Sequence, residues 1–146
     1  MNWLLDTNII LESRRPRPSE SVAQWITSVE MSQSFTSAMV VAELVYGAAL
    51  VDDVLKRRAL QKWIDDVVRL WFFGRILEVD EASLVRWRII RQKMESQGKP
   101  APAVDLLIAA AAMEGGMGIA TRDTAPFIAC GVPTFNPFTG ERFNGA

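Results

Sequence analysis

The sequence predicts an α/β domain in which a parallel β-sheet is covered by helices on both faces. Short β-prone segments alternate with amphipathic helical segments along the whole chain. With 146 residues, of which 49% are apolar and 23% are charged, the chain can bury the core of one domain of ordinary size. No internal repeat, low-complexity segment or linker divides residues 1–146, so we expect them to form a single domain.

The predicted strands are short and rich in branched and aromatic residues. The first is an apolar run that breaks at Asp6, which we interpret as a buried strand with a carboxylate at its C-terminal end. Strands are predicted at residues 2–5, 34–36, 76–79, 117–121 and 132–135.

Helices are predicted between the strands from apolar residues at i, i+3 and i+4 spacing and from capping residues. They cover residues 19–29, 37–50, 52–68, 80–97 and 103–114, with a short helix near 126–128. The second and third are expected to pair as a hairpin, and residues 12–19 are expected to form an exposed basic loop. The expected inward faces are Val54, Leu55, Ala59, Trp63, Ile64 and Val67 in the third helix, and Leu84, Val85, Trp87, Ile90 and Met94 in the fourth.

Composition removes several classes of function. The chain has no histidine, which excludes the usual general base and every Ser-His or Cys-His dyad. A single cysteine, Cys130, rules out an intrachain disulfide framework and agrees with a reducing, cytoplasmic compartment. We find neither a bilayer-spanning run nor a signal-peptide pattern. The net charge of −1 does not indicate a nucleic-acid binder, although local clusters of Lys and Arg matter more than the sum.

Two carboxylates occupy helices that are otherwise almost wholly apolar. Apart from Tyr46, Glu43 is the only ionisable residue between Phe35 and Val51, and Asp105 is the only one between Pro100 and Met113. Helices that are apolar on nearly every side are usually buried on nearly every side. A carboxylate there is unfavourable unless it is paired, hydrogen-bonded or bound to a metal.

Two further acids, Asp6 and Asp123, follow predicted strands. In a doubly wound sheet the C-terminal ends of the central strands form a crevice where all four acids can converge. Four neighbouring carboxylates remain ionised only if cations neutralise them, and oxygen ligands without His favour Mg²⁺ or Mn²⁺ over zinc. The sequence therefore predicts a divalent-metal site at this edge.

Each acid also has a structural interpretation. Asp6 can cap a helix, Asp105 can stabilise a first helical turn, and Asp123 can form an Asx turn. Glu43 can form an ion pair with Arg57 or Arg58 of the next predicted helix. These alternatives remain open for each residue taken alone.

A carboxylate-bound Mg²⁺ or Mn²⁺ ion activates water and stabilises charge on a phosphoryl oxygen, and phosphodiester hydrolysis needs both effects. Basic residues on loops near strand ends or helix starts are candidate phosphate contacts. They are Arg14, Arg15, Arg17, Lys99 and Arg122.

Four motifs in this order resemble those of the PIN-domain ribonucleases, most closely the VapC and FitB type of toxin from bacterial toxin–antitoxin pairs. They are Leu4-Leu5-Asp6-Thr7-Asn8, Thr36-Ser37 through Val41-Ala42-Glu43-Leu44, Asp105 within Asp-Leu-Leu-Ile-Ala-Ala-Ala-Ala112, and Ala120-Thr121-Arg122-Asp123. The resemblance covers essentially the whole chain. One departure is Ala111, which stands where many relatives have Thr.

The resemblance implies a three-layer α/β/α domain with a five-stranded parallel sheet and an endoribonuclease that depends on Mg²⁺ or Mn²⁺. Its metal-binding and catalytic residues would be Asp6, Glu43, Asp105 and Asp123. Asn8, Ser37 and Thr121 would be supporting polar residues. The implied partners are RNA, a second copy of the chain, and a cognate antitoxin with a DNA-binding domain.

Two other functions compete with this expectation. A phosphohydrolase would use Asp6 as a covalent nucleophile, but Asn8 stands where the common aspartate-based phosphatases carry a second Asp. A catalytically silent binding module would serve mainly in a repressor complex with a DNA-binding antitoxin. The apolar segment Trp71-Phe72-Phe73 is a predicted subunit or antitoxin interface.

Overall fold

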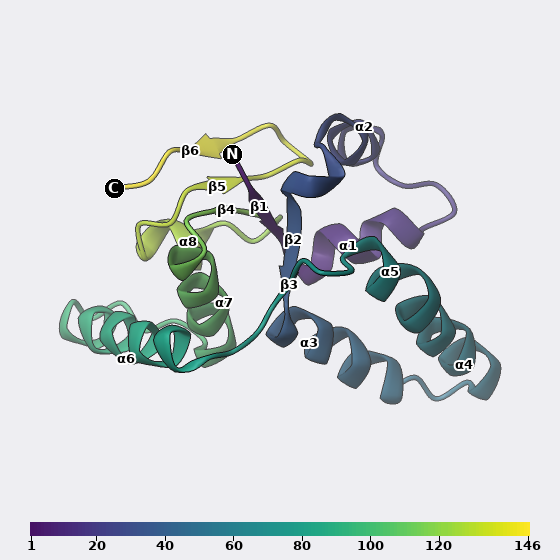
Figure 1. Cartoon of the computed structure of the whole chain (residues 1–146), viewed down its shortest axis with the longest axis horizontal. Helices are drawn as coiled ribbons and strands as arrows, with labels where there is room; N and C mark the ends of the chain where they lie inside the picture. Colours follow the sequence, from purple (N-terminus) through teal and green to yellow (C-terminus); the bar gives the residue numbers. More distant parts are fainter.

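The computed structural model describes residues 1–146, and its centre is a twisted sheet (Figure 1). The strand order is β3-β2-β1-β4-β5-β6. Every neighbouring pair is parallel except β5 and β6, which are antiparallel. The strands are β1 (Trp3–Leu5), β2 (Ser34–Ser37), β3 (Ile76–Leu77), β4 (Gly118–Ala120), β5 (Thr134–Phe135) and β6 (Arg142–Phe143).

The predicted α/β class and all five predicted strands are confirmed, and the sheet has a sixth strand that the sequence analysis missed. That strand, β6, is only two residues long and pairs at the edge, where Phe135 lies opposite Arg142. Unlike the predicted strands, residues 139–144 are mostly glycine, charged or polar and contain no run of branched or aromatic residues.

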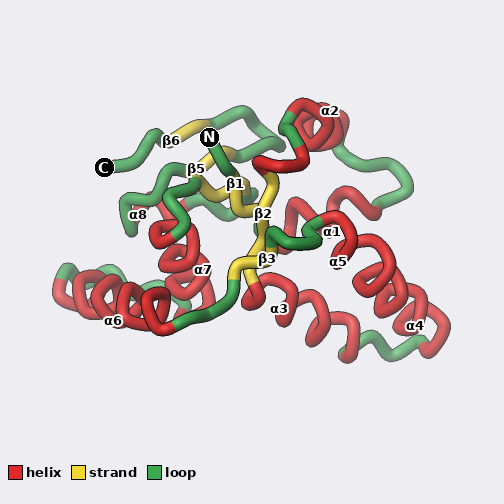
Figure 2. Tube along the Cα trace, in the orientation of Figure 1, coloured by secondary structure: helices red, strands yellow, loops and turns green.

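Helices lie on both sides of the sheet, as Figure 2 shows in red against the yellow strands. In the view of Figure 1, α6, α7 and α8 lie on one side and α1, α4 and α5 on the other. A π-helical segment, Ile64–Val68, joins α4 to α5. The helices are α1 (Thr7–Arg14), α2 (Glu20–Ser28), α3 (Ala38–Ala49), α4 (Val54–Trp63), α5 (Arg69–Trp71), α6 (Glu81–Ser96), α7 (Ala103–Glu114) and α8 (Ala125–Ala129).

The expectation of a loop over residues 12–19 is wrong for residues 12–14, which belong to α1. Glu12 is buried and accepts hydrogen bonds from the Ser19 backbone N–H at 2.8 Å and from Arg15 Nη1 at 3.3 Å. The Ser19 bond lowers the pKa of Glu12 below its ordinary value. The arginine-rich turn that follows α1 is therefore tied back to the helix.

The core contains the apolar residues of the central strands and of the helices beside them. Leu4, Leu5 and Ile119 of the sheet are fully buried. Phe72 is fully buried too and stacks on Trp71 at 4.5 Å, whereas Phe73 is 80% exposed. The expectation that Trp71-Phe72-Phe73 forms an interface is therefore wrong for Phe72, which packs into the core.

Several residues expected to face inward are exposed, because α4 and α6 lie at the periphery. No residue of α4 is fully buried, and α6 buries only Ser83, Ile90 and Met94. In α4, Leu55 is 77% exposed, and in α6, Val85 is 54% exposed. Ile90 and Met94 of α6 are buried as predicted. Four other residues that were predicted to face inward are also exposed, namely Val54, Ala59, Val67 and Leu84.

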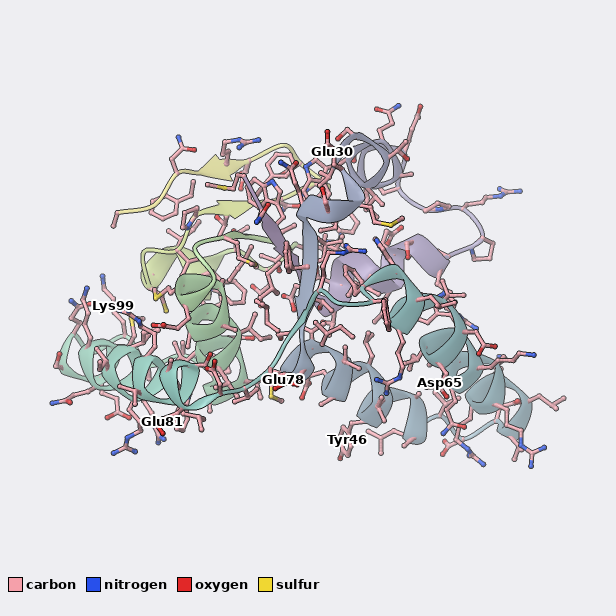
Figure 3. The ribbon with its side chains drawn as sticks, viewed as in Figure 1. Glu30, Tyr46, Asp65, Glu78, Glu81 and Lys99 are labelled. Atoms are coloured by element: carbon pink, nitrogen blue, oxygen red, sulfur yellow. The ribbon has the colours of Figure 1, made fainter.

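Helix α3 also differs from the expectation of burial on nearly every side. It packs against α1, α4 and α7, as expected for the hairpin with α4, but leaves Val45 and Tyr46 exposed. Figure 3 shows Tyr46 pointing away from the body of the protein. No helix has the length and apolar character needed to cross a membrane.

Candidate active site

Three polar side chains mark the C-terminal edge of the central strands. Asp6 directly follows β1, Ser37 ends β2, and Thr121 directly follows β4. Because β2, β1 and β4 are adjacent and parallel, their C-terminal ends meet at one edge. The expected crevice lies at this edge.

Asp6 is the most enclosed of the four predicted acids, with 6% of its surface exposed. Its Oδ1 accepts a hydrogen bond of 2.8 Å from the Thr7 N–H, which makes it the N-cap of α1. Its Oδ2 accepts a bond of 2.8 Å from the Thr121 hydroxyl. Capping thus fixes the orientation of a carboxylate that also belongs to the site.

The Thr121 hydroxyl is the centre of a small network. Besides donating to Asp6, it accepts hydrogen bonds from Asn8 Nδ2 at 3.3 Å and from the Asp123 N–H at 3.1 Å. This uses the single donor and both acceptor positions of a hydroxyl. Asn8 Oδ1 in turn accepts from the Arg122 N–H at 3.0 Å. The network joins the start of α1 to the segment after β4.

Electrostatics connects all four acids. Burial raises the pKa of Asp105, and the carboxylates of Asp6, Asp123 and Glu43 raise it further. Burial also raises the pKa of Asp6, where hydrogen bonds from Thr121 and Thr7 oppose the rise and the Asp123 carboxylate adds to it. The four side chains therefore repel one another at neutral pH, the situation that a bound cation relieves.

The four acids are not equally enclosed. Asp105 is partly buried, whereas Glu43 and Asp123 are exposed. The burial argument for Glu43 was wrong, since α3 presents that side to solvent, and Glu43 forms no ion pair with Arg57 or Arg58. No three acids lie close enough together to bind one ion jointly in the present side-chain conformation. The donor set is nevertheless all oxygen, which fits a hard divalent cation.

Ser37 is fully buried and accepts a hydrogen bond from the Val40 N–H at 3.2 Å. The predicted cap of α3 is confirmed. The neighbouring Thr36 belongs to the same motif but was not predicted as a site residue. Its buried hydroxyl donates to the Leu5 carbonyl at 3.0 Å and joins β2 to the residue before Asp6. Its position near the end of a predicted strand was the available signal.

Asn136 is a second residue that the sequence analysis missed. It is buried, accepts a hydrogen bond from the Phe138 N–H at 2.9 Å, and donates to the Arg122 carbonyl at 3.5 Å. Asn136 therefore holds the Arg122–Asp123 segment through a hydrogen bond to its backbone. Its place within Phe135-Asn136-Pro137-Phe138, directly at the end of a predicted strand, was the available signal.

The predicted basic contacts do not form one cluster. Arg14 lies 5.7 Å from the Trp63 ring centroid, Arg122 lies 4.5 Å from that of Phe138, and Arg17 forms no salt bridge. Lys99 lines a cavity of about 390 Å³ together with Asp105 and Asp123. Lys99 is thus placed beside two of the acids.

Thr121→Val is expected to reduce any metal-dependent activity of the site by about 10- to 100-fold, as loss of a ligand-orienting hydrogen bond does elsewhere. The valine leaves Asp6 Oδ2 without its donor and Asn8 and the Asp123 N–H without their acceptor. Turnover and metal affinity should be measured together. Thr121→Ser keeps the hydroxyl and should retain most of the turnover and of the metal affinity. Equal losses in Thr121→Val and Thr121→Ser would contradict the orienting role of the hydroxyl.

The raised pKa of Asp105 predicts how pH affects stability without metal. The Asp105 carboxyl binds its proton more tightly in the folded state than in the unfolded state, where its pKa has the ordinary value of 3.8. The stability contributed by Asp105 is therefore lost as pH rises from 3.8 through the raised pKa. Urea unfolding in EDTA should show the wild type losing stability relative to Asp105→Asn across this window.

Asp80 supplies a control with the opposite sign, because its hydrogen bond from the Ser83 N–H lowers its pKa. Wild type should gain stability relative to Asp80→Asn as pH rises toward 3.8. The same direction of change for both variants would contradict the environment assigned to Asp105.

Comparison with known proteins places the fold and the acids in context. A family model described as PIN domain matches residues 3–130, a range that includes all four acids. Toxin FitB of Neisseria gonorrhoeae (strain ATCC 700825 / FA 1090) is 39% identical over 135 residues, or 92% of this chain and 97% of FitB. VapC ribonuclease Y4jK of Sinorhizobium fredii (strain NBRC 101917 / NGR234) is 33% identical over 135 residues, or 92% and 96% of the two chains. A solved structure of FitAB bound to an IR36 DNA fragment matches with a TM-score of 0.88 and 39% identity, covering 95% of this chain and 97% of that chain.

Proposed function

The chain belongs to the PIN-domain family, and from this premise we propose that it is an endoribonuclease dependent on Mg²⁺ or Mn²⁺ and the toxin of a toxin–antitoxin pair. The observation that carries the proposal is the convergence of acids at the C-terminal edge of the sheet: the Thr121 hydroxyl joins the Asp6 carboxylate to the Asp123 N–H, and Asp105 lines a cavity together with Asp123. Unneutralised charge gathered at one sheet edge has no structural benefit. The names of FitB and of VapC ribonuclease Y4jK agree with this proposal.

Each acid has a distinct part in holding a divalent ion. Asp6 is fixed by Thr7 and Thr121 and provides a rigid ligand, while Asp105 approaches from α7 and Asp123 from the segment after β4. Glu43 is exposed on α3 and can adjust its side chain when the site is loaded. A bound ion supplies Lewis-acid stabilisation of phosphoryl oxygens and lowers the pKa of water.

The protein residues themselves organise the reacting groups. The Thr121 hydroxyl and the Thr7 N–H keep the Asp6 carboxylate in one orientation, so no reorganisation is needed during the reaction. Because the chain has no histidine, a carboxylate of the site would accept the proton of the attacking water.

The proposed partners follow from exposed apolar surface and from the relatives. FitAB has been solved bound to DNA, and we propose a DNA-binding antitoxin for this chain as well. Exposed Val45 and Tyr46 on α3, together with Val85 and Ile89 on α6, support binding of a second copy or of the antitoxin. A cytoplasmic location agrees with the free Cys130.

The proposed activity is tested with purified, antitoxin-free protein and single-stranded RNA. Cleavage is expected with Mg²⁺ or Mn²⁺ and should stop when EDTA is added. Sustained cleavage in EDTA would refute the metal-dependent mechanism. If calorimetry shows that the protein binds neither ion and no RNA is cleaved, the protein is instead a binding module of the same fold.

A further inference from the structure

A cavity of about 390 Å³ opens directly beside the candidate active site. Asp105, Asp123 and Lys99 are among its lining residues, and Lys99 belongs to the loop between α6 and α7. Figure 3 shows Lys99 near the end of α6, at the margin of the molecule. The volume lies within the range of about 300–1,000 Å³ typical of ligand sites.

The walls of this cavity divide into charged and apolar parts. Met94, Pro102 and Pro126 contribute apolar side chains from α6, the α6–α7 loop and α8. None of these three side chains has a strong hydrogen-bond donor, so they can contact a flat apolar group without selecting its polar edge. The cavity thus offers apolar packing between two acids and a cation.

The ammonium group of Lys99 is free. This group takes part in no salt bridge and no side-chain hydrogen bond. The backbone N–H of Lys99 donates a hydrogen bond to the Met94 carbonyl at 2.9 Å. By contrast, the neighbouring Arg122 stacks on Phe138. Because Lys99 is exposed and its ammonium group is unpaired, it can contact an anionic ligand group.

We propose that this cavity is the subsite for the nucleotide next to the cleaved phosphodiester, with the base against the Pro102 and Pro126 side and a flanking phosphate on Lys99. This inference rests on the proposed ribonuclease function. Asp105 and Asp123 line both the cavity and the candidate metal site, so a nucleotide here is continuous with a phosphate held at the acids. The absence of strong donors and acceptors on the apolar walls makes the subsite tolerant of base identity.

Lys99→Gln tests the phosphate contact with a short single-stranded oligoribonucleotide as substrate. The variant should raise KM while leaving kcat nearly unchanged, and the slope of log KM against log salt should shrink by about 0.7, the value for one phosphate contact on a single strand. Lys56→Gln, on α4, is the matched control, because Lys56 is exposed and lies away from the cavity. Unchanged KM and slope in Lys99→Gln, or equal changes in both variants, would overturn the assignment.

Ala125→Leu tests the base contact, because Ala125 is exposed at the start of α8 and lines the cavity. After the cleavage site is mapped, KM is measured with intact RNA and with RNA that lacks the base next to the cleaved bond. The leucine should raise KM for intact RNA by roughly threefold to tenfold, somewhat less than the loss of an aromatic stacking contact. With the abasic RNA, variant and wild type should have the same KM.

Different results would overturn the nucleotide subsite and the ribonuclease function. If wild type cleaves RNA but both substitutions leave KM unchanged, or if the abasic RNA binds wild type as well as intact RNA, the subsite is overturned and the ribonuclease function stands. If wild type cleaves no RNA with either metal ion, the ribonuclease function is overturned and the subsite with it.

Discussion

Replacing Asp6 by Asn is expected to lower the rate of RNA cleavage by at least about a hundredfold, since loss of a residue that only orients a metal ligand already reduces activity by about 10- to 100-fold. Asparagine keeps an oxygen that can accept the Thr7 hydrogen bond, but it removes the negative charge. Folding should be retained, because that charge is repelled by Asp123 in the metal-free protein. The rate should be measured under single-turnover conditions.

Asp53→Asn is the matched control for this experiment. Asp53 caps α4 by accepting a hydrogen bond from the Lys56 N–H at 2.9 Å, just as Asp6 caps α1. It is exposed and has no part in the candidate site. Asp53→Asn should cleave RNA at the wild-type rate, and full activity of Asp6→Asn would refute the metal-dependent mechanism.

Addition of Mg²⁺ or Mn²⁺ is expected to raise the melting temperature of the wild type strongly. Binding to the folded state at a hundredfold excess over Kd adds about 2.7 kcal/mol of stability, which corresponds to roughly 5–11 °C for a domain of this size. Relief of repulsion among Asp6, Asp105 and Asp123 gives this stabilisation its physical basis.

The shift is measured by calorimetry after dialysis against EDTA and stepwise addition of the ion. Asp105→Asn removes a ligand that makes no hydrogen bond of its own, so the variant should fold well and lose most of the shift. An equal shift in wild type and Asp105→Asn would show that the ion binds somewhere else.

Much of the architecture could be predicted from the sequence because the strands are bounded by clear breaks and several helices begin at a capping side chain. Ser37 caps α3 and Asp80 caps α6 as their side chains suggest. Helix α1 could not be told from a turn, because Asp6-Thr7-Asn8 fits a turn as well as a helix start. Only the buried contacts of Ile9 and Ile10 decide between the two.

The burial of two of the acids differs from what the sequence indicates. Glu43 lies on an almost wholly apolar helix, yet it is exposed, whereas Asp6, which also caps a helix, is enclosed. Periodicity cannot reveal burial when a helix is apolar all round, because every face then looks equally suited to the core. The exposed faces of α3 and α6 instead fit partner surfaces.

The supporting contacts of the site lie largely beyond sequence reasoning. Thr36 and Asn136 act through partners that are 31 and 14 residues away in the chain, Leu5 and Arg122. Such contacts depend on sheet order, which brings β2 next to β1 and β5 next to β4. Single residues therefore acquire their roles only when the topology is known.

The most direct test of the proposed metal site is a crystal grown with Mn²⁺ and measured for anomalous scattering. We expect an anomalous peak in contact with Asp6 and with at least one carboxylate from Asp105, Asp123 or Glu43. A well-diffracting crystal at saturating Mn²⁺ with no peak among these four acids would contradict the proposed site.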